Sequence, residues 1–336
     1  MFFQTNVRIV SRMKTYPIPN TPLRATCLAY GCMQIGGTWD NAPLTSIDRA
    51  RARSVIERAL AHGINFFDHA DIYCRGKSET VFAEALREMK IARDTLILQT
   101  KCGIRFADDP DAGIPERFDF SYEHIIEAVE GSLRRLQTDY VDILLLHRPD
   151  ALIEPEEVAR VFDELHRAGK VKFFGVSNHT WAQIALLKKF VTQPLVVNQV
   201  ELSLLRADLI DDGMFFNTSP RPYTGIGGTL DYCRANDILI QAWAPVANGK
   251  LFNPAHDASP NIKRVAGLIA HMAQMKNTTH EAVALAWLLK HPAPIQPILG
   301  TTNPERITAS CRADEIELTR EEWYALLKAA RGQALP

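Results

Sequence analysis

The segment INFFDHADIYCRG, residues 64–76, joins a short apolar run to a group of titratable side chains. The run itself, INFFDHA (64–70), is rich in β-forming residues and too evenly apolar for a half-exposed antiparallel strand. Asp68 closes the run, and Tyr73 follows in the segment beyond it. A buried strand that ends in polar groups is typical of parallel βα proteins, whose functional side chains lie at the carboxyl ends of the strands.

Seven further runs of this kind are spread along the chain, which makes eight predicted strands buried on both faces. They are LAYGCM (28–33), TLILQTK (95–101), YVDILLLH (140–147), VKFFGVSN (171–178), PLVVNQVE (194–201), ILIQAWAP (238–245) and PIQPILGT (294–301).

Helical patterns lie between the runs. Ser46 is expected to cap a first helix that ends at Gly63, and Thr180 and Thr279 are expected to cap two later ones. The other helices are predicted near residues 77–90, 155–168 and 224–235, over the apolar stripes 125–136 and 262–272, and from about residue 304, with a tail helix at 319–331.

Alternating strands and helices predict an α/β fold, a closed (β/α)8 TIM barrel with a C-terminal tail helix. The expected organisation is one domain over residues 1–336, with a core of about 25–315 and residues 1–12 as a loose extension. A doubly wound open sheet is the alternative. That fold usually has G-x-G-x-x-G after its first strand, whereas GCMQIGG follows here.

Composition argues against several functional classes. The net charge of −1 argues against a nucleic-acid or membrane-surface protein, which would normally carry a basic face. The six cysteines include no C-x-x-C pair, and they predict reduced thiols in a cytoplasmic protein rather than a disulfide frame or a metal site. No apolar run reaches transmembrane length, and the N-terminus lacks the apolar core of a signal peptide.

Polar or aromatic groups stand at the same end of seven successive predicted strands. They are Asp68 with Tyr73, Lys101, His147, Ser177 with Asn178, Gln199, Trp243, and Gly300 with Thr301 and Thr302. Four of them suit proton transfer. A lysine ammonium near a tyrosine favours the phenolate and lowers the tyrosine pKa, an aspartate can hold the lysine, and a histidine can orient a carbonyl oxygen.

Each of these residues also has an ordinary structural interpretation. Tyr73 could be a packing residue, Lys101 a charge at a strand end, Asp68 a loop cap, and His147 a half-buried histidine with satisfied hydrogen bonds. Their recurrence at corresponding strand ends favours a catalytic group. Cys32, Cys74 and Cys102 neighbour these residues and are interpreted as packing residues.

The chain resembles the aldo-keto reductases, and in particular a bacterial-type branch of plausible oxidoreductases. GINFFDHADIYCRGKSE resembles the signature G-x-x-x-x-D-T-A-x-x-Y-G-x-x-E, with His69 at its threonine and Cys74 at its glycine. LILQTKCG corresponds to the family motif that contains the catalytic lysine, and LLLHRPD to the motif that contains the catalytic histidine. The resemblance implies that the catalytic residues are Asp68, Tyr73, Lys101 and His147.

The resemblance also implies a nicotinamide cofactor. GVSNHT and NQVELS correspond to the residues that hold the carboxamide. AWAPVANGKLF corresponds to the aromatic residue on the nicotinamide ring and to the pyrophosphate loop that follows it. GCM corresponds to the end of the first strand. The cofactor-binding residues so implied are Gly31, Met33, Asp68, Ser177, Asn178, Gln199, Trp243, Pro245, Gly249, Lys250, Leu251, Gly300, Thr301, Thr302, Arg306 and Ser310.

One departure from the family pattern bears on which cofactor is used. PILGTTNPERITAS resembles the phosphate motif I-P-K-S-x-T-P-E-R-I-x-x-N, but its lysine is Gly300 here and its asparagine is Ser310. Arg306 is expected to bind a 2′-phosphate through a bidentate contact, and the less favoured alternative is a solvated helix residue. NADPH is therefore expected to be preferred, with NADH tolerated and no metal required.

The implied function is reduction of a small-molecule aldehyde or ketone by a monomer. Two alternatives remain: an NAD(P)-linked sugar or alcohol dehydrogenase working in the oxidative direction, and a slow-turnover NADPH-sensing regulatory subunit. The substrate pocket is expected to draw on Trp39, on the long loop 102–120, and on Phe215 and Phe216 of the loop 203–222.

Overall fold

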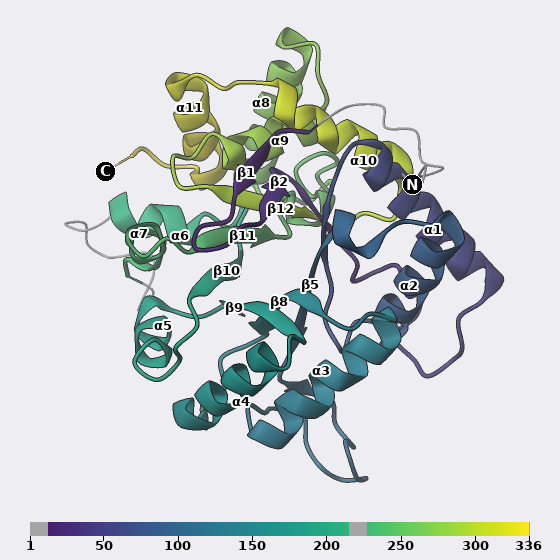
Figure 1. Cartoon of the computed structure of the whole chain (residues 1–336). Helices are drawn as coiled ribbons and strands as arrows, with labels where there is room; N and C mark the ends of the chain where they lie inside the picture. Colours follow the sequence, from purple (N-terminus) through teal and green to yellow (C-terminus); the bar gives the residue numbers. More distant parts are fainter. Residues whose placement is uncertain (1–12, 215–226, 336) are drawn as a thin grey trace.

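The computed structural model describes residues 13–214 and 227–335. Within them, eight parallel strands close into a barrel in chain order, and the last strand pairs with the first (Figure 1). Seven of the strands fall within a predicted run and the eighth, β5, extends one residue beyond its run, so the predicted barrel is confirmed. The strands are β3 (Ala29–Gly31), β4 (Phe66–Asp68), β5 (Ile97–Cys102), β8 (Val141–Leu146), β9 (Val171–Ser177), β10 (Leu195–Glu201), β11 (Leu239–Trp243) and β12 (Ile295–Leu299).

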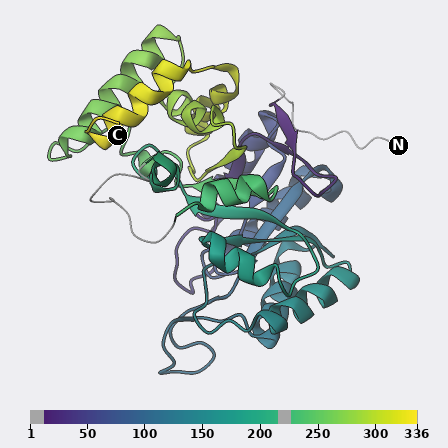
Figure 2. The same ribbon diagram turned by 90° about the vertical axis from the view of Figure 1, so that its left-hand side faces the viewer.

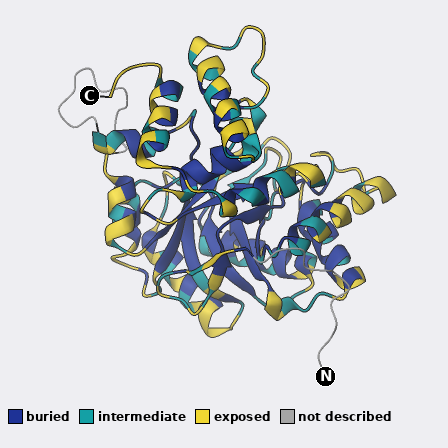
Figure 3. Cartoon of the chain, turned by 90° about the horizontal axis from the view of Figure 1, so that it is seen from above, coloured by how far each residue is buried: buried dark blue, intermediate teal, exposed yellow. Residues whose placement is uncertain are grey.

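Helices form a layer around the strands, with buried inner and exposed outer faces (Figure 3). The α-helices are α1 (Ser46–Ala61), α2 (Lys77–Met89), α3 (Tyr122–Leu136), α4 (Pro155–Arg167), α5 (Trp181–Leu187), α6 (Asp208–Asp211), α7 (Thr229–Ala235), α8 (Pro260–Met275), α9 (His280–Leu289), α10 (Pro304–Cys311) and α11 (Arg320–Arg331). Short 3-10 turns are η1 (Arg93–Thr95), η2 (Asp212–Met214), η3 (Ala247–Gly249) and η4 (Arg312–Glu315).

The helix starts follow from capping chemistry. Thr180 caps α5 with a reciprocal capping box, and Thr279 caps α9, as predicted. The prediction for α1 was one residue out, because Thr45 rather than Ser46 is the N-cap. The Thr45 hydroxyl accepts from the backbone N–H of Asp48, whose carboxylate accepts from the Thr45 N–H in return. The same helix ends at Ala61, two residues before Gly63.

A hairpin of β1 (Thr15–Pro17) and β2 (Arg24–Thr26) covers one end of the barrel. Ile18 from its turn is fully buried and belongs to the apolar cluster inside the barrel, with Phe66, Ile143 and Leu239. The larger core cluster lies between the strands and the surrounding helices. This hairpin leads directly into β3, so the covered end is the amino-terminal one and the opposite end is left for the site.

The two long loops contain structure of their own. The loop 102–120 includes an antiparallel ribbon of β6 (Ile104–Arg105) and β7 (Arg117–Phe118), tied by the ion pairs of Arg105 with Asp109 and Asp119. The loop 203–222 begins with α6 and η2. Phe215 and Phe216, like residues 1–12, lie outside the described residues, so the predictions for them stay predictions.

The tail helix α11 packs on α8 at one corner of the molecule, as Figure 2 shows with yellow α11 beside green α8. Trp323 of α11 stacks on Trp287 of α9 at 5.1 Å between ring centroids, and each indole N–H donates to the other residue's carbonyl. These contacts make the tail helix part of the folded barrel. None of the helices in the described ranges is long and apolar enough to span a membrane.

Candidate active site

Asp68, Lys101 and Tyr73 form one hydrogen-bonded group at the carboxyl end of the barrel. β4 ends in Asp68, neighbouring β5 carries Lys101, and Tyr73 lies in the segment that leads from β4 to α2. Lys101 Nζ donates to Asp68 Oδ2 at 2.8 Å, to Tyr73 Oη at 2.9 Å and to the His69 carbonyl at 2.7 Å. The lysine is fully buried, so these three acceptors satisfy an ammonium that would otherwise be costly to remove from water.

Burial and neighbouring charge act in opposite directions on this group. Burial lowers the pKa of Lys101, but Asp68 and Tyr73 outweigh it, and the lysine pKa is raised above its ordinary value. Burial raises the pKa of Tyr73, and it outweighs the lowering by Lys101. The expectation of a lowered tyrosine pKa was therefore wrong for the free protein. Tyr73 keeps its proton at neutral pH, and because its oxygen already accepts from Lys101, that proton is available to the cavity.

His147 follows β8 and lies beside this group, with its ring 5.9 Å from that of Tyr73 in an edge-to-face arrangement. Burial lowers the pKa of His147 well below its ordinary value, and the charges of Lys101 and Arg148 lower it further. The imidazole is therefore neutral at physiological pH. A neutral imidazole with one N–H can donate to a carbonyl oxygen without carrying a charge.

The segment after Tyr73 needs a backbone conformation that favours glycine. Cys74 has φ = +48° and Arg75 has φ = +56°, both in the left-handed region. Cys74 stands where the resembling signature has glycine, and its thiol donates to the Met33 carbonyl at 3.2 Å. Burial raises the pKa of the Cys32, Cys74 and Cys102 thiols, in agreement with packing roles.

A second set of linked side chains comes from β9, β10 and β11. Ser177 Oγ donates to the Gln199 carbonyl at 2.9 Å, and Asn178 Nδ2 donates to Ser177 Oγ at 2.9 Å. Trp243 Nε1 donates to Asn178 Oδ1 at 3.0 Å, which fixes the indole plane. Gln199 Nε2 donates to Asp68 Oδ1 at 3.0 Å and so joins this set to the catalytic candidates.

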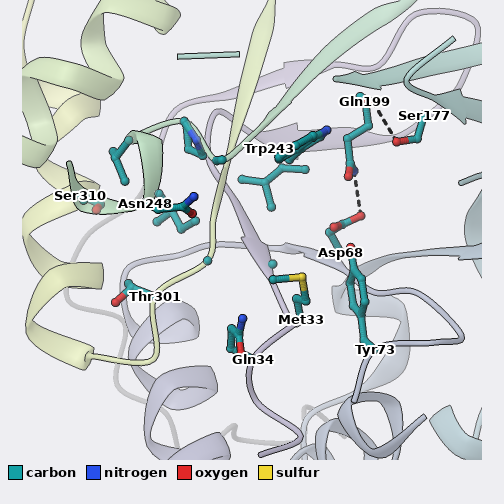
Figure 4. Close-up of a pocket in the computed structure, with 18 of the residues that line it drawn as sticks. Met33, Gln34, Asp68, Tyr73, Ser177, Gln199, Trp243, Asn248, Thr301 and Ser310 are labelled. Atoms are coloured by element: carbon teal, nitrogen blue, oxygen red, sulfur yellow. Dashed lines mark hydrogen bonds between the residues drawn. The ribbon is translucent and has the colours of Figure 1, made fainter. Parts of the chain in front are cut away.

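Members of both sets line one cavity of about 650 Å³. Figure 4 shows Asp68, Tyr73, Ser177 and Gln199 at one end of it, Asn248, Thr301 and Ser310 at the other, and Met33 and Trp243 between them. Seven more of the predicted site residues also line it, and they are Gly31, His147, Asn178, Pro245, Gly249, Gly300 and Arg306. Trp39 and Ile104, from the regions expected to form the substrate pocket, line it too.

The far end of the cavity can accept an anion. Helix α10 begins there, and exposed Arg306 in its first turn makes no side-chain hydrogen bond or ion pair with the described residues. Thr301 lines the same end. A helix start, an unpaired guanidinium and a hydroxyl are suited to a phosphate group.

Some predicted site residues do not line the cavity. Lys101 lies behind Tyr73, Leu251 is fully buried in the core, and Lys250 and Thr302 lie outside the lining. The sequence prediction in turn missed several lining residues. Gln34 and Arg148 directly follow predicted residues, so the sequence could have indicated them. Glu281 comes from α9, and no local sequence pattern marks it. Ile72 and Phe252 were also missed.

Comparison with known proteins came to the same family. The model of the Aldo/keto reductase family matches residues 27–331. The chain is 36% identical over 289 residues to "Uncharacterized oxidoreductase YcsN" of Bacillus subtilis (strain 168), covering 85% of this chain and 90% of that protein. It is 35% identical over 312 residues to "6-dehydroglucose reductase" of Agrobacterium fabrum, covering 93% and 96%. Among solved structures, the glycerol dehydrogenase from Gluconobacter oxydans superposes with a TM-score of 0.78 at 24% identity, over 94% of each chain.

Proposed function

The chain belongs to the aldo/keto reductase family and is an NAD(P)H-dependent oxidoreductase, and we propose that it reduces an aldehyde or ketone with NADPH and uses Tyr73 as the acid. One observation carries this proposal. A buried lysine donates to Tyr73 Oη and to Asp68, while the tyrosine itself faces the cavity with its proton in place.

The shape and chemistry of the cavity fit a dinucleotide. Ser177, Asn178 and Gln199 present amide and hydroxyl groups at the end near Tyr73, and the indole of Trp243 offers a flat face. Thr301 and Arg306 offer a hydroxyl and an unpaired cation at the other end. These residues would hold the carboxamide, the ring and the 2′-phosphate of NADPH. NADH tolerance is part of the proposal, because Gly300 supplies no cation.

NADPH, when bound, supplies the hydride that forms the new C–H bond at the carbonyl carbon. Tyr73 Oη gives its proton to the carbonyl oxygen, whose π-electron pair becomes the new O–H bond. Lys101 donates to the phenolate that remains, and Asp68 balances the lysine charge. His147, neutral, orients the carbonyl oxygen through a ring N–H.

A sugar aldehyde is the first substrate to test. The relative from Agrobacterium fabrum is named for 6-dehydroglucose. Arg148 lines the cavity beside His147, and it makes no ion pair or hydrogen bond with the described residues. A guanidinium with free donors can bind the hydroxyl oxygens of a sugar.

The one-domain organisation, the monomeric state and the cytoplasmic location stay predictions.

The test is NADPH consumption against a panel of sugar aldehydes, simple aldehydes, ketones and dicarbonyls, with Tyr73→Phe alongside. Wild type is expected to turn over, and Tyr73→Phe to lose at least about 100-fold in kcat while cofactor binding persists. Tyr140→Phe is the matched control, because Tyr140 precedes β8 at the opposite end and its ring packs against Arg93.

Other outcomes separate the alternatives. Faster oxidation of an alcohol with NADP or NAD than reduction of any carbonyl would favour the dehydrogenase. Tight NADPH binding without turnover in either direction would favour a regulatory subunit. Equal rates for Tyr73→Phe and wild type would contradict the assigned acid.

A further inference from the structure

Arg148 is a charged residue at the reacting end of the cavity that forms no ion pair with the described residues. It directly follows His147, and its guanidinium carbon lies 5.6 Å from the centre of the Trp243 ring. The residue is half-buried, so water screens its charge less than it screens a charge on the outer surface.

The other charges that line the described part of the cavity are either paired or at the far end. Asp68 forms an ion pair with Lys101 at 2.8 Å, so these two opposite charges largely cancel. Arg306 lies in the first turn of α10. Glu281 lies in the first turn of α9, beside α10, because the Thr279 hydroxyl that caps α9 donates to a carbonyl of α10 at 2.7 Å. An uncompensated positive charge therefore remains at the reacting end.

The charge of Arg148 already acts on a neighbouring ring. Burial is the main cause that lowers the pKa of His147, and the charges of Lys101 and Arg148 add to it. A positive charge that disfavours a cationic imidazole also disfavours any other cationic ring that binds at the same end of the cavity.

The two redox states of a nicotinamide cofactor differ in the charge of such a ring. The oxidised pyridinium ring carries one positive charge and the reduced dihydropyridine ring carries none, while the ribose and phosphate groups are the same in both. A ring that stacks on the Trp243 indole comes within about 10 Å of the Arg148 guanidinium, a separation comparable to the Debye length. Repulsion between two like charges at this range corresponds to about a three- to tenfold change in a dissociation constant.

We propose that Arg148 is a specificity residue for the redox state of the cofactor, whose guanidinium favours NADPH over the oxidised form, NADP. The inference rests on the proposed nicotinamide site. It bears on the direction of the reaction, because a protein that binds NADPH more tightly is loaded with the reductant and releases the oxidised cofactor more readily. Hydrogen bonds from Arg148 to a sugar hydroxyl would leave its charge in place, so the two roles are compatible.

Binding of the two redox states, without any substrate, tests the inference. Dissociation constants for NADPH and NADP are measured by quenching of tryptophan fluorescence or by calorimetry. Wild type is expected to prefer NADPH, and Arg148→Met is expected to lower that preference about three- to tenfold. Arg148→Lys keeps the positive charge and is expected to stay within about twofold of wild type.

Arg306→Met is the matched control, because it removes the same charge from the other end of the same cavity. It is expected to weaken the binding of NADPH and NADP by similar factors, since both carry the 2′-phosphate, and to keep their ratio within about twofold of wild type. Circular dichroism establishes that each variant is folded, and Arg148→Gln carries the test if Arg148→Met does not fold.

A wild-type ratio in folded Arg148→Met would overturn the inference, as would a wild type without a preference for NADPH. An Arg148→Lys ratio as low as that of Arg148→Met would also overturn it, because shape rather than charge would then decide the preference. So would an equal loss of preference in Arg306→Met, because the effect would not belong to the ring. A wild type that binds neither nucleotide would instead overturn the proposed function, so the two failures are distinguishable.

Discussion

At the scale of single residues, the site holds a tyrosine and a histidine in uncharged forms beside a buried cation. Burial dominates the pKa shifts of Tyr73 and His147, and it acts to keep both neutral. Lys101 supplies the positive charge, and Asp68 balances it. The free protein is thus already in the protonation state that the proposed carbonyl reduction requires, with Tyr73 protonated before a substrate arrives.

His69 gives a residue-scale prediction about acid stability. Burial, and then Lys101, lowers the pKa of His69 to about 3, so the folded protein keeps this histidine neutral. The unfolded chain takes up a proton near pH ~6.5, so the stabilising contribution is complete above that pH and is lost as pH falls towards the folded pKa. Between about pH 7 and 5 this residue alone is expected to reduce the free energy of unfolding by about 2 kcal/mol.

Urea unfolding of wild type and His69→Leu at the two pH values measures this effect. The variant is expected to lose about 2 kcal/mol less than wild type on acidification. Phe82→Leu is the control, because its ring packs against His69 at 4.5 Å between centroids but does not titrate. It should lower stability by a similar amount at both pH values. An unchanged acid loss in His69→Leu would contradict the assignment.

At the scale of elements, the first turn of α10 and the residues before it form the end of the cavity that we propose binds the 2′-phosphate. Gly300 stands where the family motif has lysine, and a Cβ built there meets no atom within 4 Å. Its φ also lies outside the left-handed region that disfavours other side chains. The position can therefore accept a long side chain without backbone strain.

Two substitutions in this segment are predicted to move cofactor preference in opposite directions. Arg306→Ala is expected to raise KM for NADPH about tenfold and to leave KM for NADH nearly unchanged, because only NADPH has the 2′-phosphate. Gly300→Lys is expected to strengthen the preference for NADPH about three- to tenfold.

Steady-state kinetics with both cofactors checks these expectations, with Arg264→Ala as the control at an exposed α8 position that does not line the cavity. Equal changes in KM for NADPH and NADH in Arg306→Ala would mean that the guanidinium does not bind the 2′-phosphate.

At the scale of the whole molecule, the amino-terminal hairpin completes the barrel interior. Ile18 is fully buried in the barrel cluster, and Tyr16 and Leu23 of the same hairpin pack against that cluster. Ile18→Ala is expected to lower the free energy of unfolding by about 3 kcal/mol, through lost transfer free energy and the cavity left behind.

Denaturant unfolding measures this loss. Ile47→Ala on the surface of α1, where the side chain is 75% exposed, is expected to change stability by no more than about 0.5 kcal/mol. Comparable losses in the two variants would show that the hairpin does not close the interior.

Much of the fold and site was predictable because local patterns carry it. The eight strands are continuous apolar runs, and most helices are indicated by a capping residue and by apolar residues with a 3.6-residue period. The strand-end residues could be grouped because parallel strands of a barrel bring their carboxyl ends together. Glu281 could not be predicted in this way, since it enters the cavity from the start of α9, and only the packing of α9 against its neighbours brings it there.

The sequence by itself determined the barrel, the order of its strands and the residue types at its mouth, because periodicity and strand-end chemistry are local. Only the tertiary structure decided the sign of the Tyr73 pKa shift, since that sign depends on how much burial opposes one lysine contact. It also decided which buried glutamines meet, because Gln99, Gln199, Gln241 and Gln296 lie far apart in the chain and are joined by hydrogen bonds only once the strands are in register. Local patterns specify which groups are available, while three-dimensional packing specifies which of them share a proton or a hydrogen bond.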